Sequence, residues 1–298
     1  MDGNLPDPAR CAAAGTDKIK GSTGDVKTSD NGVLRHDWQQ GASACYFKYM
    51  LNHSPRPPAP CPLNLAPIRA ALFDLDGTLI DVDMQQFVPA YLHRLAGRLS
   101  DCADPRQIVR TLHSAVMTML DGTHGECSLE ELLRAMLAEQ LQLAWPDYQA
   151  GLVTFCREDL GELRPLVNPH PLARALVEAC LARGWRVALA TNPIFPRAVI
   201  EARLAWGGLA DLPFQPVTSY ETSRHCKPHA GFFTDLLAEI DLEPEACLMV
   251  GNDTLHDLAA ARFGLSTCLL TTWRIDRPGM ALPADWEGQH QALLELLG

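Results

Sequence analysis

The stretch AALFDLDGTLIDVD, residues 70–83, decides the fold. An apolar run at 68–73 is followed at once by Asp74 and Asp76, with Gly77 next to them. A short apolar run bounded by turn residues indicates a buried strand. Two carboxylates at the end of such a strand repel each other and lose hydration, so the arrangement is costly unless something compensates. The stretch therefore predicts a strand whose carboxyl end carries a chemical site.

Beyond this stretch, apolar runs alternate with helical patterns. The further runs lie at 186–191, 214–220, 247–251 and 266–272, and the helical patterns lie at 171–184, 196–206, 230–240 and 254–264. The run at 214–220 is the weakest of them. Alternation of this kind is typical of a parallel sheet covered by helices on both faces. The sequence thus predicts an α/β fold with a Rossmann-like, doubly wound parallel sheet as its core.

One segment interrupts this alternation. Between about 84 and 163 only helical periodicity is found, in four patterns at 84–99, 105–120, 128–143 and 146–163. Asp104 followed by Pro105 predicts the start of the second helix, and Ser128 with Glu131 predicts a capping box for the third. An all-helical cap is therefore expected at 83–164, between core segments 67–82 and 165–298. Asp81 and Asp83 are interpreted as solvated hinge residues leading into the cap.

The first 66 residues differ in composition from the rest. They are rich in Gly, Ser, Asp, Pro and Lys and have no regular period, which predicts a disordered tail and linker. No pattern of a signal peptide and no apolar run long enough for a bilayer is present. Ten scattered cysteines without a CxxC pair favour reduced thiols in a cytoplasmic protein. A net charge of −11 argues against nucleic-acid or membrane partners, and the oligomeric state stays open.

Polar side chains gather at the predicted strand ends, where ligands bind in open parallel sheets. The ends carry these residues in chain order: Asp74 and Asp76, then Thr191 and Asn192, then Lys227, then Asp253 and Asp257. Several carboxylates at one sheet edge predict a bound divalent cation, and an all-oxygen donor set favours Mg²⁺. A hydroxyl and an ammonium beside them predict a phosphate ligand. Lys227 is the only lysine after position 48, which indicates a site that needs a compact point charge.

Four short motifs that follow one another in a fixed order give a more specific signal than any single residue. DLDGT, ATN after a strand, KP and GNDTLHD closely resemble the four motifs of the haloacid dehalogenase superfamily of phosphohydrolases. The resemblance covers about residues 67–272, and the helical insertion resembles the type 1 cap of that superfamily. It implies a phosphatase that acts on a small phosphorylated metabolite and uses Mg²⁺.

The resemblance also implies roles for single residues. Asp74 would be the nucleophile that forms an aspartyl-phosphate, and Asp76 the general acid and base. Thr191, Asn192 and Lys227 would bind the phosphate group. The resemblance implies a metal held by Asp74, the backbone carbonyl of Asp76, and a carboxylate of the fourth motif.

In the fourth motif, Asp253 would supply the metal ligand, and Asp257 would orient the ligands around the ion. The loop 121–127 joins two predicted cap helices and holds two glycines. If this loop faces the core, Thr123 or His124 helps to set substrate specificity.

Several relatives in the same superfamily use the same nucleophile differently. A dehalogenase of this superfamily needs no acid two residues after the nucleophile, so the presence of Asp76 argues against that activity. A lysine-free cap speaks against a phosphonate hydrolase that forms a Schiff base. A phosphomutase with the same nucleophile and a catalytically silent binding or regulatory protein remain open alternatives.

Overall fold

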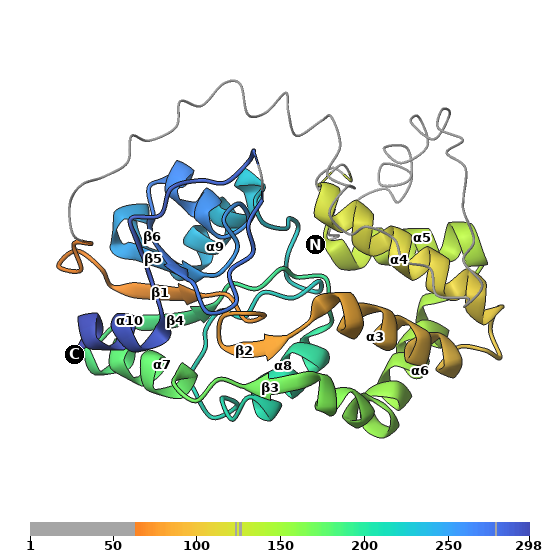
Figure 1. The fold of residues 1–298 in the computed structure, drawn as a ribbon. Helices are drawn as coiled ribbons and strands as arrows, with labels where there is room; N and C mark the ends of the chain where they lie inside the picture. Colours follow the sequence, from red (N-terminus) through yellow and green to blue (C-terminus); the bar gives the residue numbers. More distant parts are fainter. Residues whose placement is uncertain (1–62, 123, 125–126, 278) are drawn as a thin grey trace, which may run out of the picture.

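A five-stranded parallel sheet forms the centre of the computed structural model, which describes residues 63–122, 124, 127–277 and 279–298 (Figure 1). The expected tail at 1–66 lies outside the described residues up to residue 62. The strand order is β4-β1-β5-β6-β7, and all neighbours are parallel. The strands are β1 (Ala70–Phe73), β4 (Arg186–Leu189), β5 (Cys247–Gly251), β6 (Ser266–Leu270) and β7 (Trp286–Gly288).

Helices cover both faces of this sheet, because successive strand residues point to opposite sides. Phe73 and Val250 share one hydrophobic cluster with α7 (Ala173–Ala182), α8 (Arg197–Trp206) and α10 (His290–Leu297). The alternate residues Leu72 and Met249 pack with α9 (Ala230–Ile240) and the 3-10 turn η3 (Leu258–Phe263) on the other face. A second 3-10 turn, η2 (Pro244–Ala246), leads into β5. The doubly wound α/β fold expected from the sequence is confirmed.

Two expected elements are weaker than the sequence pattern indicates. The run at 214–220 contributes only one bridge, between Val217 and Leu189, because Pro216 has no N–H to donate to a ladder. The pattern at 254–264 forms helix only at η3, because residues 253–257 make a tight turn whose amides bind carboxylates. The strand β7 and the helix α10 were not anticipated.

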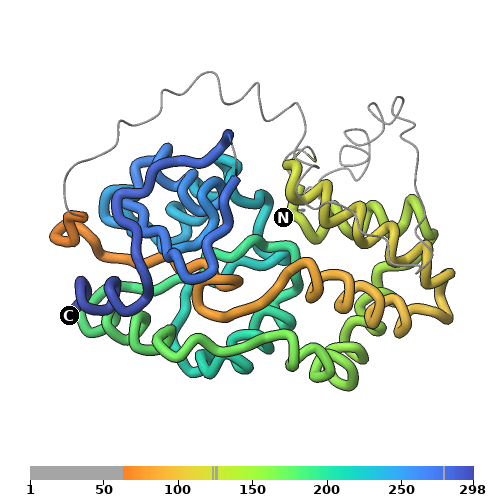
Figure 2. Tube along the Cα trace, viewed as in Figure 1, coloured from red at the N-terminus to blue at the C-terminus, as the bar shows by residue number. Residues whose placement is uncertain are grey.

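The helical insertion lies between two short antiparallel strands. The chain leaves the core through β2 (Ile80–Val82) and returns through β3 (Val167–Pro169), as the tube in Figure 2 shows. Between them lie α3 (Met84–Arg98), α4 (Pro105–Asp121), α5 (Leu129–Leu141), α6 (Trp145–Glu158) and the 3-10 helix η1 (Leu160–Leu166). Asp104 caps α4, and Ser128 with Glu131 forms the capping box of α5, as expected.

The hinge aspartates have distinct local positions. Asp81 lies in β2, whereas Asp83 is the N-cap of α3 and accepts a hydrogen bond from the backbone N of Gln85. The side chain of Asp83 thus fixes where the first cap helix begins, a specific role beyond that of a solvated hinge residue.

Cap and core are joined by hydrogen bonds to one core segment, residues 220–229, which we call the cap-contact loop. The bonds are Leu129 N to Ser223 O, Glu130 N to Tyr220 O, His229 Nε2 to Leu120 O, and His124 Nε2 to Arg224 O, at 2.8–3.0 Å. At Gly122, which ends α4 with φ 65°, a Cβ would lie 2.6 Å from the His229 ring. Only glycine permits this approach.

Aromatic contacts continue the junction between cap and core. Phe195 of the core meets Phe87 and Tyr91 of α3 edge-on, with ring centroids 5.7 Å and 5.2 Å apart. One hydrophobic cluster therefore runs from the sheet into the cap. Among the described residues, no helix combines the length and hydropathy needed to cross a membrane.

Candidate active site

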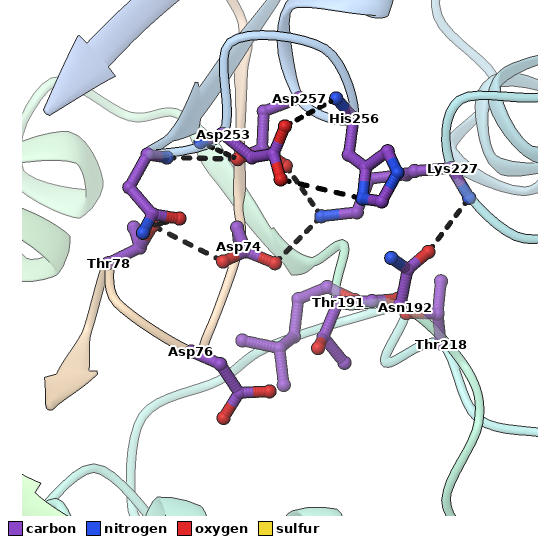
Figure 3. A network of polar contacts seen from close by, with 12 residues as sticks. Asp74, Asp76, Thr78, Thr191, Asn192, Thr218, Lys227, Asp253, His256 and Asp257 are labelled. Carbon is purple, nitrogen blue, oxygen red and sulfur yellow. Dashed lines mark hydrogen bonds and ion pairs between the residues drawn. The ribbon is translucent and has the colours of Figure 1, made fainter. Parts of the chain in front are cut away.

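The candidate site lies where β1, β4 and β5 end (Figure 3). Asp74 directly follows β1, and its N–H still bonds to the carbonyl of Val250 in β5 at 2.9 Å. The chain then turns sharply at Gly77, which has φ 81° and where a Cβ would lie 2.2 Å from Asn252 Nδ2. A residue without a side chain is needed there, because the turn presses against Asn252.

Lys227 connects two of the predicted carboxylates. Its Nζ donates to Asp74 Oδ1 and to Asp257 Oδ1, each at 2.7 Å, and its side chain is 2% exposed. The second oxygen of Asp257 accepts from the backbone N–H groups of Asn252 and Asp253, both at 2.9 Å. Asp257 therefore holds the β5 turn and the ammonium at once.

Burial has the largest effect on the pKa values of Asp74 and Lys227. It raises the pKa of Asp74 to about 7 even though Lys227 lowers it, and Asp257 and Asp76 raise it further. Burial lowers the pKa of Lys227, but the two neighbouring carboxylates outweigh it and leave that pKa above its usual value. The site thus holds more negative charge than one ammonium cancels.

Asp76 forms an ion pair with a different cation, the guanidinium of Arg203. Nη1 of Arg203, on α8, donates to both carboxylate oxygens of Asp76, at 2.6 Å and 2.8 Å. Sequence reasoning missed Arg203. The signal was present, since Arg203 lies on the apolar stripe of α8 with Val199, Ile200 and Leu204.

The end of β4 supplies the predicted phosphate-binding residues. Thr191 is buried, and its carbonyl accepts a hydrogen bond from Thr218 Oγ1 at 2.7 Å. Asn192 Oδ1 accepts from the backbone N–H of Lys227 at 2.8 Å, which ties the end of β4 to the lysine segment. Figure 3 shows both residues beside Asp74 and Lys227. The structure brings these four residues together.

Asp253 is turned toward a second arginine that sequence reasoning missed. Its Oδ2 accepts from Nη2 and Nε of Arg277, at 2.6 Å and 3.0 Å. Its Oδ1 accepts from the backbone N–H groups of Leu255 and His256. Although burial raises the pKa of Asp253, His256 and Arg277 outweigh it and lower that pKa.

Asp74, Asp76 and Asp253 are therefore each paired with a separate cation. Within the described part of the chain, no group of three or more His, Cys, Asp or Glu side chains is arranged to hold a metal ion. The chemistry of the site still fits a divalent cation, because Asp74 keeps a raised pKa in spite of its ammonium partner.

An amide oxygen near Asp74 adds to this fit. Thr78 Oγ1 lies 3.3 Å from Asp74 Oδ2 and 3.5 Å from Asn252 Oδ1. Carboxylate and amide oxygens are the donors that hard divalent cations prefer. Asn252, which precedes Asp253 in the fourth motif, thus contacts the same hydroxyl as Asp74.

The cap contributes His124, which is buried and bonds to the backbone of Arg224, three residues before Lys227. The carbonyl can only accept, so Nε2 is the donor in this bond. Nδ1 is buried and has no hydrogen-bond partner among the described residues. The other specificity candidate, Thr123, lies outside the described residues.

A family model for haloacid dehalogenase-like hydrolases matches residues 68–263. The chain therefore belongs to this family, and the resemblance noted in the sequence is confirmed.

The curated relatives agree with this assignment. Pyrophosphatase PpaX of Bacillus cereus (strain Q1) is 24% identical over 208 residues, which cover 70% of this chain and 85% of the relative. Hexitol phosphatase B of Escherichia coli (strain K12) is 25% identical over 200 residues, covering 65% and 79%. A predicted phosphoglycolate phosphatase from Haemophilus somnus 129pt is 21% identical with a TM-score of 0.48, covering 79% of this chain and all of that one. The family and the curated relatives support an enzyme of the phosphatase type and name no substrate for this chain.

Proposed function

We propose that this protein is a Mg²⁺-dependent phosphohydrolase that cleaves a small phosphorylated metabolite through an aspartyl-phosphate. One observation carries the proposal: the buried Lys227 ammonium contacts Asp74 and Asp257 at 2.7 Å, with Asp76 two residues from Asp74. A buried carboxylate beside an ammonium, at the end of a central strand, suits attack on a phosphate group. A carboxylate attacks a phosphate dianion only where positive charge offsets the repulsion.

In the proposed first step, Asp74 forms a bond to phosphorus while the bond to the leaving oxygen breaks, and Asp76 gives that oxygen its proton. In the second step, water attacks phosphorus and gives a proton to Asp76, and Asp74 is regenerated with release of inorganic phosphate. Lys227 neutralises charge on the nucleophile and on the transferring group. Thr191 and Asn192, at the end of β4, would bind phosphoryl oxygens.

Asp74, the backbone carbonyl of Asp76 and Asp253 would hold the Mg²⁺ ion, and Asp257 would orient this set. Bound there, the ion supplies positive charge to the phosphoryl oxygens. The raised pKa of Asp74 supports a need for this charge. For Asp253 to bind the ion, its carboxylate must leave the fork made by Arg277.

We further propose that residues 83–164 act as the cap that selects the substrate, with His124 and Thr123 as candidates for contact with the leaving group. A small phosphate ester is the partner that this site suits. The net charge of −11 supports a protein without nucleic-acid or membrane partners, and the reduced thiols that the sequence predicts support work in the cytoplasm.

The test is hydrolysis of p-nitrophenyl phosphate with and without Mg²⁺. Wild type is expected to be active only with Mg²⁺, and Asp74→Asn to lose at least about 10³-fold in kcat because the nucleophile is gone. Asp81→Asn, a change of the same chemistry in β2, is the matched control and should keep activity. Turnover by Asp74→Asn equal to wild type would exclude the nucleophile. A wild type with no turnover of any phosphate ester would favour the silent binding protein.

A further inference from the structure

The side chain of Arg203 is completely buried at the junction of cap and core. Its Cζ lies 4.5 Å from the ring centroid of Phe195 in the core and 5.3 Å from that of Phe87 in α3 of the cap. A guanidinium can stack on aromatic rings, but removing its charge from water is costly without an anionic partner. The contact that explains its presence is therefore the one with Asp76.

The geometry of that contact is asymmetric. A single nitrogen, Nη1, contacts both oxygens of Asp76, whereas arginine and carboxylate commonly pair through two nitrogens. Nε and Nη2 of Arg203 are buried and have no hydrogen-bond partner among the described residues. The pair is thus not a fully satisfied structural fork. A carboxylate held by one nitrogen can rotate about it without losing the ion pair.

The one-sided contact matters because Asp76 is the residue proposed to transfer a proton. A guanidinium only donates, and both oxygens of Asp76 accept from the one nitrogen of Arg203. The carboxyl group is therefore held from one side, with 14% of its side chain exposed. In the proposed reaction the same carboxyl must deliver a proton to the leaving oxygen, and rotation about the contact with Nη1 would allow this.

We propose that Arg203 is the positioning residue for proton transfer by Asp76: it holds the carboxylate at one nitrogen beside the nucleophile, from which it turns to the leaving oxygen. This inference rests on the proposed function. Within the described part of the chain, the side-chain hydrogen bonds of Arg203 go to Asp76 and not to Asp74 or Lys227, so it acts on the reaction through Asp76. Phe87 belongs to α3, so the position of the cap also shapes the surroundings of the guanidinium.

The test compares two leaving groups of similar size. Phenyl phosphate depends strongly on proton donation, whereas p-nitrophenyl phosphate releases a stable anion and depends on it little. In Arg203→Met, kcat/KM for phenyl phosphate should fall at least about 30-fold, and for p-nitrophenyl phosphate less than about 3-fold. The quantity kcat/KM is used because it reports phosphoryl transfer to the enzyme even where release of phosphate limits kcat. Arg197→Met, on the solvent side of the same helix, is the matched control.

Two further variants keep the test decisive. Arg203→Lys retains the charge, so its ratio of the two kcat/KM values should move in the same direction by a smaller factor, and it replaces the Met variant if that one does not fold. In an Asp76→Asn background, Arg203→Met should leave the ratio unchanged, because the residue acts through Asp76. An equal loss for both substrates, or a further change in that background, would overturn the inference. Failure of wild type on both substrates would instead overturn the proposed function.

Discussion

Asp74 and Asp76 are only two residues apart, but they are paired with different kinds of cation. On one side, the ammonium of Lys227 is divided between Asp74 and Asp257. On the other, the guanidinium of Arg203 is devoted to Asp76 and sits against two phenyl rings. The proposed nucleophile thus shares its cation with a second carboxylate, whereas the residue proposed to transfer the proton has a cation that contacts no other carboxylate among the described residues.

The difference follows from what each cation can do. An ammonium is compact and donates in three directions, so Lys227 can lie between two carboxylates and leave Asp74 Oδ2 with only a long contact to Thr78. A guanidinium is planar and wide, so Arg203 fills the space behind Asp76. In the proposed reaction, the first arrangement would leave an oxygen of Asp74 available for attack, and the second would set the direction of the Asp76 carboxyl group.

The largest effect is expected from removing the shared cation. Lys227→Met leaves Asp74 and Asp257 buried without their partner, so kcat should fall by about 10²–10³-fold. The free energy of unfolding should fall by roughly 3 kcal/mol at pH 8, because a buried pair has been broken. Lys227→Arg, which keeps the charge but not the shape, is the matched comparison in both assays. Full activity in the Met variant would refute the role of the shared ammonium.

The next largest effect is on the pH dependence of the free energy of unfolding, and it depends on Asp74. With its pKa raised to about 7, Asp74 binds a proton in the folded protein at pH values where the unfolded chain, near 3.8, does not. Its contribution to stability is thus complete below about pH 4 and lost as the pH rises through about 7. Asp74→Asn should therefore gain roughly 3 kcal/mol relative to wild type between pH 4 and 8. Urea unfolding in EDTA measures this, and parallel pH curves for the two proteins would contradict it.

A smaller effect is expected at Arg277, which competes for Asp253. In Arg277→Gln the carboxylate loses its guanidinium fork, so the Mg²⁺ concentration for half-saturation should fall about three- to tenfold. Calorimetric titration of Mg²⁺ measures binding without relying on turnover. Arg274→Gln, in the same loop but paired with Asp276 and Glu287, is the control. Weaker Mg²⁺ binding in the Arg277 variant would show that the fork assists the ion instead of competing with it.

The smallest effect is expected in the cap, away from both cations. His124→Ala removes one of the bonds to the cap-contact loop, so KM for a cap-dependent alkyl phosphate should rise about two- to fivefold. With p-nitrophenyl phosphate kcat should stay within about twofold of wild type. A fall in kcat as large as that of Lys227→Met would mean that His124 belongs to the chemistry instead.

Much of the fold could be predicted because local sequence patterns determine it. The four cap helices follow from their periodicity, and Asp104 and Ser128 mark two of their starts correctly. The strand ends were predictable because parallel strands deliver their carboxyl ends to one edge. β2 and β3 were not, since three residues each show no usable alternation, and β7 carries a glutamate between Trp286 and Gly288.

The limits in the site have a different cause. Arg203 and Asp76 are 127 positions apart, and an arginine in an amphipathic helix is ordinarily solvated. The apolar stripe of α8 indicates that this one is buried, but no local pattern reveals that Asp76 is its partner. The direction of the Asp253 side chain was equally hidden, because it depends on Arg277 in a loop without periodicity. Residue types at strand ends can be predicted, whereas the partner that each side chain selects depends on long-range packing.

The cap-contact loop has a consequence for the timing of turnover. The same ten residues that bond to Leu120, Leu129 and Glu130 of the cap also carry Lys227. A movement of the cap away from the loop would therefore also disturb the backbone next to the ammonium. In the proposed reaction, the positive charge beside Asp74 would then be fully in place only while the cap rests on this loop.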